Sequence, residues 1–121
     1  MPLHESAEMY LETIYVLSKQ TGSVRSIDIA EHMGYSKPSV SRAVGLLKKG
    51  GYIDMAKDGY ISLTNEGLEV SKKIFDRHTL LSGFLKSLGV SDETAANDAC
   101  KIEHVISDET MAAINNYIRN K

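Results

Sequence analysis

The fold of this chain is decided between residues 29 and 40, where the sequence reads Ile29-Ala30-Glu31-His32-Met33-Gly34-Tyr35-Ser36-Lys37-Pro38-Ser39-Val40. Ala30 is small enough to let two helices cross closely, and Gly34 suits a turn that needs a positive φ. Val40 supplies an apolar inner position for the helix that follows the turn. This spacing predicts a helix-turn-helix, with one helix over residues 26–33 and another over residues 37–50. We expect Ser26 to cap the first of these helices and Ile27 to be among its apolar positions.

An amphipathic helix is expected before this unit, and a hairpin is expected after it. Residues 6–20 carry apolar side chains at helical spacing, with Ser6 as the expected cap. Two short β-prone runs flank Lys57-Asp58-Gly59, and Asp-Gly is a strong hairpin signal. Helices followed by a hairpin in this order are typical of a winged helix-turn-helix.

Three further helices are expected after the hairpin. A long helix capped by Thr64 should run to about residue 88, a second should cover residues 91–106, and a third should start at Ser107. Gly67 and Gly83 are expected weak points of the long helix, because glycine is a poor helix former. We therefore expect a mainly α fold with a small β-hairpin, with a winged helix-turn-helix domain over residues 1–64 and a helical domain over residues 65–121.

The composition excludes several classes of protein. A chain of 121 residues, of which 42% are hydrophobic and 25% charged, can fold around its own core without disulfides, and Cys100 is its single cysteine. The N-terminus lacks a secretory pattern, and no apolar run reaches the ~20 residues that a membrane span requires. We therefore expect a cytoplasmic protein without a membrane partner. The net charge of −2 argues at first sight against nucleic-acid binding.

The charges are, however, unevenly distributed along the chain. Asp54 is the single acid between Lys37 and Lys57, a stretch that carries five basic residues, whereas acids gather between Asp92 and Glu109. The basic stretch falls on the helix and hairpin that a winged helix-turn-helix presents to double-stranded DNA. The start of a helix suits phosphate contacts, and arginine can pair with guanine. The candidate DNA contacts are Arg25, Ser36, Lys37, Pro38, Ser39, Ser41, Arg42, Lys48 and Lys57. A winged helix used for protein contacts is the alternative.

Cys100, Glu103 and His104 form a candidate metal site. Residues three and four apart share a helix face, so a helix that continues past His104 would bring the three side chains together. Thiolate, carboxylate and imidazole groups are ligands of first-row transition metals. A buried cysteine beside a surface Glu-His pair is the simpler explanation of this string taken alone.

Two other regions carry candidate ligands. Met9 and Glu12 lie one turn apart on the first expected helix, and His78 lies within the long helix. Taken singly, Met9 is more often a core residue and His78 a satisfied polar residue. The apolar positions of the last three helices exceed what a small helical cluster can cover by itself, so we also expect a homodimer.

Several segments resemble the diphtheria-toxin-repressor family, which contains iron-dependent repressors and the manganese-dependent transport regulator. Residues 6–15 resemble its opening helix, residues 29–31 and 36–41 its helix-turn-helix, and residues 98–109 its metal-binding helix. The resemblance covers nearly the whole chain. It implies a metal-dependent repressor that binds palindromic operator DNA as a dimer, controls metal homeostasis genes, and lacks the C-terminal SH3-like domain of longer relatives. Residues 65–121 would then be the metal-binding and dimerisation domain.

The resemblance also implies a set of metal ligands. Iron-type members hold a primary ion with Met, Cys, Glu and His at the positions of Met9, Cys100, Glu103 and His104. Their second site combines the equivalent of His78 with two ligands at the positions of Ser82 and Ala96, which are not ligands here.

Manganese-type members have Asp in place of Met9 and Glu in place of Cys100, and they use the equivalents of Glu12 and His78. This chain combines the soft iron-type ligands with Glu12, so we expect Fe²⁺, with Mn²⁺, Co²⁺, Ni²⁺ or Zn²⁺ as alternatives. An ion that bridges the first helix and the C-terminal helices would fix the DNA-reading helix, residues 37–50, relative to the dimer core. The two DNA-reading helices of a dimer must lie about 34 Å apart to meet successive major grooves.

Three other interpretations remain beside this one. The chain could be a manganese-responsive member of the same family, a winged-helix regulator that senses no metal, or a protein whose metal is purely structural. A metalloenzyme is disfavoured, because the chain shows no glycine-rich loop and leaves little length for a substrate pocket. We therefore expect neither catalysis nor a small organic substrate.

Overall fold

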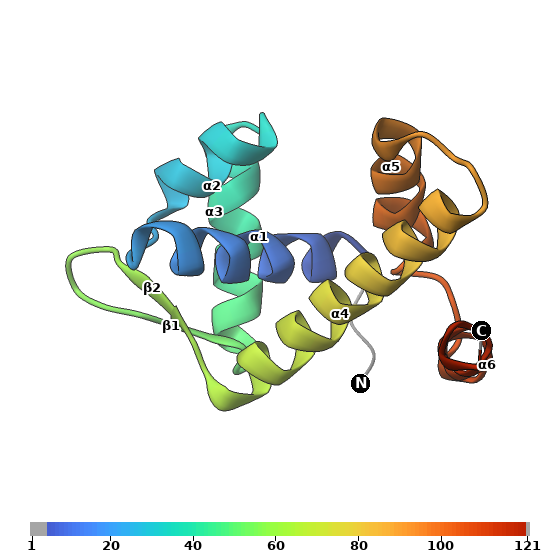
Figure 1. The fold of residues 1–121 in the computed structure, drawn as a ribbon. Helices are drawn as coiled ribbons and strands as arrows, with labels where there is room; N and C mark the ends of the chain where they lie inside the picture. Colours follow the sequence, from blue (N-terminus) through green and yellow to red (C-terminus); the bar gives the residue numbers. More distant parts are fainter. Residues whose placement is uncertain (1–4, 121) are drawn as a thin grey trace. The chain divides into compact units, whose positions relative to one another are not determined.

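The computed structural model describes residues 5–120 of the chain. Its elements follow in the order α1 (Glu5–Thr21), α2 (Ser26–Met33), α3 (Lys37–Lys49), β1 (Ile53–Met55), β2 (Ile61–Leu63), α4 (Asn65–Ser87), α5 (Asp92–Ile102) and α6 (Asp108–Arg119) (Figure 1). This order confirms the expected mainly α fold with one hairpin. The chain forms two compact units that divide within α4, between Lys72 and Lys73. No helix among the described residues is long and apolar enough to cross a membrane.

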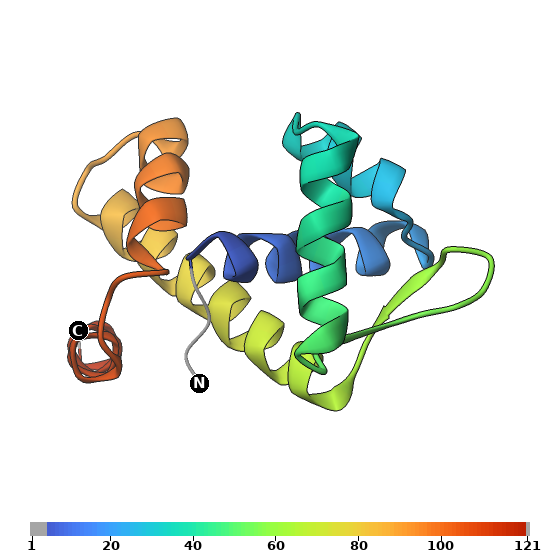
Figure 2. The ribbon, with the colours of Figure 1, turned by 180° about the vertical axis from the view of Figure 1, so that it is seen from behind.

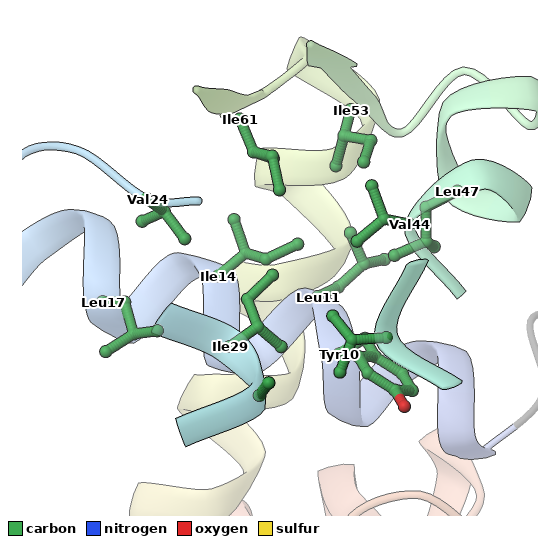
Figure 3. Packing of buried hydrophobic residues seen from close by; sticks show 12 residues of the cluster. Tyr10, Leu11, Ile14, Leu17, Val24, Ile29, Val44, Leu47, Ile53 and Ile61 are labelled. Atoms are coloured by element: carbon green, nitrogen blue, oxygen red, sulfur yellow. The ribbon is translucent and has the colours of Figure 1, made fainter. Parts of the chain in front are cut away.

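The first unit packs three helices and the hairpin around one hydrophobic core. Its α3 passes across α1, as the view from behind shows (Figure 2). Side chains from α1, α2, α3 and both strands point toward one another in this core (Figure 3). Each aliphatic side chain that is fully buried stabilises the unit by about 1.5–3 kcal/mol. The core residues are Tyr10, Leu11, Ile14, Leu17, Val24, Ile29, Ala30, Val40, Val44, Leu47, Ile53 and Ile61.

The turn between α2 and α3 has the geometry that the spacing predicts. Gly34 has a φ of 72° and donates its N–H to the Ala30 carbonyl at 2.9 Å, which ends α2. The Ser36 side chain accepts the N–H of Ser39 at 3.3 Å and so caps α3. Val40 is fully buried on the inner side of α3. The helix-turn-helix prediction is therefore confirmed.

Three local expectations are wrong. Ser26 is the first residue of α2 and not its cap, because Arg25 holds the cap position and donates its N–H to the Asp28 carboxylate at 2.8 Å. Ile27 is 41% exposed, so it does not belong to the core. Ser6 lies inside α1, whose bounds are Glu5–Thr21, so it is not the cap of this helix.

The hairpin leads directly into α4 through a close backbone contact. The Thr64 hydroxyl donates to the Gly51 carbonyl at 2.7 Å and accepts the N–H of Gly67 at 3.1 Å, which confirms Thr64 as the helix cap. A β-carbon added to Gly67 would lie 1.9 Å from the Tyr52 carbonyl oxygen. Gly67 is therefore required by a close approach of two backbone segments and is not a weak point of the helix.

The second unit contains the rest of α4 together with α5 and α6. Leu81, Ala99 and Met111 form its buried core, one residue from each helix, and α5 lies beside the C-terminal half of α4 (Figure 1). The Ser107 side chain accepts the N–H of Thr110 at 3.1 Å, so α6 begins where the sequence predicts.

We expect Gly67→Ala to lower the free energy of unfolding by about 1–3 kcal/mol or more, because the added methyl group must displace the Tyr52 backbone. Gly83→Ala is the matched control, since a β-carbon there meets no described atom within 4 Å. It should instead stabilise the chain by up to about 1 kcal/mol. Urea unfolding followed by circular dichroism measures both, and equal effects would contradict the assigned contact.

Candidate metal centre and nucleic-acid interface

The side chain of Arg77, on α4, sets the path of the chain after α5. Its Nη1 donates to the carbonyls of Glu103, at 3.1 Å, and Ile106, at 3.2 Å, while Nη2 contacts the Asp108 carboxylate. These carbonyls are thereby satisfied outside a helix, and α5 ends at Ile102. The expected continuation of this helix to residue 106 is therefore wrong.

The early end of α5 changes how the candidate ligands are placed. Cys100 is half-buried in the last turn of α5, Glu103 occupies the C-cap position, and His104 lies in the turn that follows. A single helix face shared by all three residues, as the sequence predicts, is therefore not what the structure shows. The Arg77 contacts, which helical periodicity does not reveal, hold Glu103 and the turn that follows it.

Glu103 lies between two histidines of the second unit. Its side chain is fully buried, with Oε2 2.9 Å from His78 Nδ1 and Oε1 3.2 Å from His104 Nε2. When His78 donates from Nδ1, its Nε2 keeps a lone pair and can act as a ligand. The structure thus brings His78, Glu103 and His104 together, from an α4 position and from the turn after α5.

The Glu103 Oε1 atom makes no hydrogen bond to any described residue. A buried carboxylate oxygen without a donor costs free energy, so this atom calls for a positively charged partner. Carboxylate oxygen and imidazole nitrogen atoms are ligands that divalent first-row metals accept. The side chains present here therefore fit a divalent metal ion.

The other positions singled out as metal ligands lie on α1, α4 and α5. Met9 and Glu12 are half-buried on α1, in the first unit, and lie one turn apart. Ser82 is buried on α4 and Ala96 is half-buried on α5, and neither side chain supplies a strong ligand atom. The second site that the resemblance implies thus lacks two of its side chains here.

All the predicted DNA contacts are exposed on the first unit. The first turn of α3 carries Lys37 and no acidic residue, so the positive end of this helix can face a phosphate. Lys49 is exposed as well, and it lies seven residues after Arg42 on the same helix. Seven residues make about two turns, so the two cations share a face. Sequence reasoning omitted Lys49 as a contact, although helical spacing from Arg42 would have found it.

A second residue that sequence reasoning missed is Tyr60, in the hairpin. The guanidinium carbon of Arg25 lies 4.2 Å from the centre of the Tyr60 ring, which is a cation–π arrangement. Tyr60 follows the turn at Lys57-Asp58-Gly59 and is 38% exposed. The Tyr60 ring therefore holds the Arg25 side chain, a predicted DNA contact, beside the hairpin.

Two family models match consecutive parts of the chain. The model of the iron dependent repressor N-terminal DNA binding domain matches residues 2–61, and that of the iron dependent repressor metal binding and dimerisation domain matches residues 64–120. The fold and the site together define a metal-dependent DNA-binding regulator. The chain belongs to the iron-dependent repressor family, which is a family of transcriptional regulators and not of enzymes.

Individual relatives cover most of the chain. An uncharacterised HTH-type transcriptional regulator of Methanocaldococcus jannaschii is 33% identical over 111 residues, 90% of this chain and 89% of its own length. The transcriptional regulator MntR of Escherichia coli is 36% identical over 109 residues, 90% of this chain and 70% of its own.

A solved structure also shares the fold. A manganese-dependent transcriptional repressor, in complex with manganese, superposes with a TM-score of 0.84 at 29% identity. The match covers 92% of this chain and 51% of that structure, so this chain spans about half the length of that solved relative.

We expect Arg77→Met to lower the free energy of unfolding of the metal-free chain by about 2 kcal/mol or more, because two carbonyls lose their donor. Lys73→Met is the matched control: Lys73 is 60% exposed and contacts Asp108 at 3.2 Å, so its loss should cost less than about 1 kcal/mol. Hydrogen bonds and charge from Lys73, then from Arg77, hold the pKa of Asp108 below its usual range. Chemical denaturation at neutral pH keeps this carboxylate ionised, and similar losses in both variants would contradict the role given to Arg77.

We expect Tyr60→Ala to weaken DNA binding about 2–5-fold, the range of an exposed cation–π contact, whereas Tyr60→Phe should retain the affinity. Fluorescence anisotropy with a labelled duplex measures the affinity. In an Arg25→Ala background the Tyr60→Ala change should have no further effect. Additive losses in this double-mutant cycle would show that Tyr60 acts independently of Arg25.

Proposed function

We propose that this chain is a metal-activated repressor that binds palindromic operator DNA as a homodimer, in the cytoplasm, and controls metal homeostasis genes. The observation that carries the metal half of this proposal is the buried Glu103 carboxylate, with one oxygen facing His104 and left without a hydrogen bond. Membership of the family supports the DNA-binding half and the dimer.

The ligand candidates differ in what supports them. Glu103 and His104 would bind the ion directly, and His78 would either join them or orient the Glu103 carboxylate through its 2.9 Å contact. The other ligand candidates are supported by their match to the ligand positions of the family. The proposed ligands are Met9, Glu12, His78, Cys100, Glu103 and His104. A bound divalent ion would supply positive charge to the Glu103 oxygen that makes no hydrogen bond to a described residue.

The identity of the ion depends on the sulfur ligands. The Met9 thioether and the Cys100 thiolate favour Fe²⁺ over Mn²⁺, and Co²⁺, Ni²⁺ and Zn²⁺ also suit them. Glu12, Glu103 and the two histidines are equally good ligands for Mn²⁺. The manganese-bound relative described above favours Mn²⁺, which is therefore the second candidate.

The first unit would carry the DNA contacts. Arg42 and Lys49 would face the major groove from α3, and Lys57 would reach the DNA backbone from the hairpin. The other proposed contacts, on the same unit, are Arg25, Ser36, Lys37, Pro38, Ser39, Ser41 and Lys48. Phosphate contacts set the affinity and its salt dependence, while base contacts in the groove set the sequence preference.

One contact within the first unit supports coupling between metal and DNA. Tyr10 lies on α1 between Met9 and Glu12, and its ring centre is 6.0 Å from that of Tyr35. Tyr35 directly precedes the Ser36 cap of α3. Metal binding that restrains α1 at Met9 and Glu12 would therefore act, through Tyr10, on Tyr35 beside the start of α3. Regulation requires such a coupling free energy between the two sites.

The decisive experiment measures DNA affinity against metal. A duplex is first selected from a random library by the wild-type chain in the presence of Fe²⁺ or Mn²⁺, under anaerobic conditions. We expect metal to raise the affinity for this duplex at least 10-fold, and Glu103→Gln to abolish the increase while the chain stays folded. Cys100→Ala should reduce the response to Fe²⁺ more than the response to Mn²⁺, because only the soft ligand is lost.

Glu93→Gln is the matched control, since Glu93 is an exposed carboxylate on the first turn of α5. It should leave the metal response unchanged. Metal binding without any effect on DNA affinity would indicate a structural ion, and equal DNA affinity with no metal bound would indicate a winged-helix regulator that senses no metal.

A further inference from the structure

Gly45 lies in the interior of α3, where no described residue requires a glycine. It is exposed, and a β-carbon built on it meets no described atom within 4 Å. Its φ is not among the positive values found for other glycines of the described chain, such as Gly34. Alanine would favour a helix here over glycine. Neither the packing nor the backbone of the described residues therefore explains this glycine.

The position of Gly45 on the helix points to a partner outside the chain. Val40, Val44 and Leu47 form the buried side of α3. Helical spacing places Gly45 on the opposite side, three residues after Arg42 and four residues before Lys49. The whole of α3 carries no acid. Gly45 is thus the uncharged, side-chain-free centre of a basic helix face.

A DNA major groove would explain a residue without a side chain at this centre. The groove is about 12 Å wide, and an α-helix with its side chains is about 10–12 Å across, so the fit leaves little space. A glycine on the side that faces the groove floor lets the helix backbone move closer to the base edges. Residues one turn away on either side can then reach the bases and phosphates.

We propose that Gly45 is the point at which α3 comes closest to the DNA bases, and that it determines the specificity of operator recognition. This inference rests on the proposed function, because it requires double-stranded DNA as the partner of α3. The missing side chain lowers the intrinsic stability of the helix and allows Arg42 and Lys49 to engage the groove together. Stability and specific affinity should therefore respond to a side chain at this position in opposite directions.

The test compares Gly45→Ala and Gly45→Leu with the wild type and with Gly83→Ala. Both alanine variants should raise the melting temperature by about 4 °C, because each replaces an exposed mid-helix glycine. Gly45→Ala should weaken binding to the selected duplex by about 10-fold, comparable to the loss of one base pair of readout, and Gly45→Leu should weaken it further. Gly83→Ala should leave the affinity unchanged, with sedimentation confirming an unchanged oligomeric state.

A second measurement separates specificity from general damage. Binding to a random duplex at low salt depends on phosphate contacts, so Gly45→Ala should retain it and should lose only the preference for the selected sequence. The inference is overturned if Gly45→Ala binds the selected duplex as tightly as the wild type, or if it changes the oligomeric state instead. If the wild type selects no duplex at all, with or without metal, the proposed function fails first and the inference fails with it.

Discussion

The guanidinium group of Arg77 determines the arrangement of the second unit. By donating to the carbonyls of Glu103 and Ile106 it satisfies two groups that would otherwise favour continuation of α5. The contact with Asp108 then ties the start of α6 to the same side chain. The loop between α5 and α6 is thereby fixed against α4, and α4 is the helix that carries His78.

The consequence of this arrangement is a buried carboxylate whose hydrogen bonds are incomplete. His78 satisfies one oxygen of Glu103, and the other oxygen lies 3.2 Å from the His104 ring nitrogen without a hydrogen bond to any described residue. A fold that serves stability alone avoids such a group, because desolvation of an ionised carboxylate is costly. Violations of a local rule of this kind are expected at functional sites, where a bound ligand supplies the missing interaction.

The first unit follows a different principle, because its functional residues need no burial. Its core supports α3 from one side and leaves the opposite side exposed, with Arg42 and Lys49 on a face free of acids. The overall net charge of −2 therefore gives no indication of this surface, since DNA responds to the local field of a basic helix and hairpin. Tyr10 and Tyr35 connect α1 to the start of α3 within this unit.

The sequence by itself determined the helix-turn-helix, the hairpin, the cap at Thr64 and the start of the last helix near Ser107, because each depends on residues close together in the chain. Helical spacing also predicted Cys100, Glu103 and His104 as a group, although for a partly mistaken reason, and the resemblance to the family added His78. Periodicity treated α5 as a continuous helix, and no local pattern reveals that a side chain 26 residues earlier binds the Glu103 carbonyl.

Only the tertiary structure decided the features that depend on contacts between distant segments. Gly67 is needed because the Tyr52 carbonyl lies against it, and Arg25 is held by the ring of Tyr60. The end of α5, and with it the setting of the Glu103 carboxylate, follows from Arg77 on α4. Hydrophobic periodicity reports which side of an element is buried, but it does not report which polar group from another element will satisfy a free carbonyl.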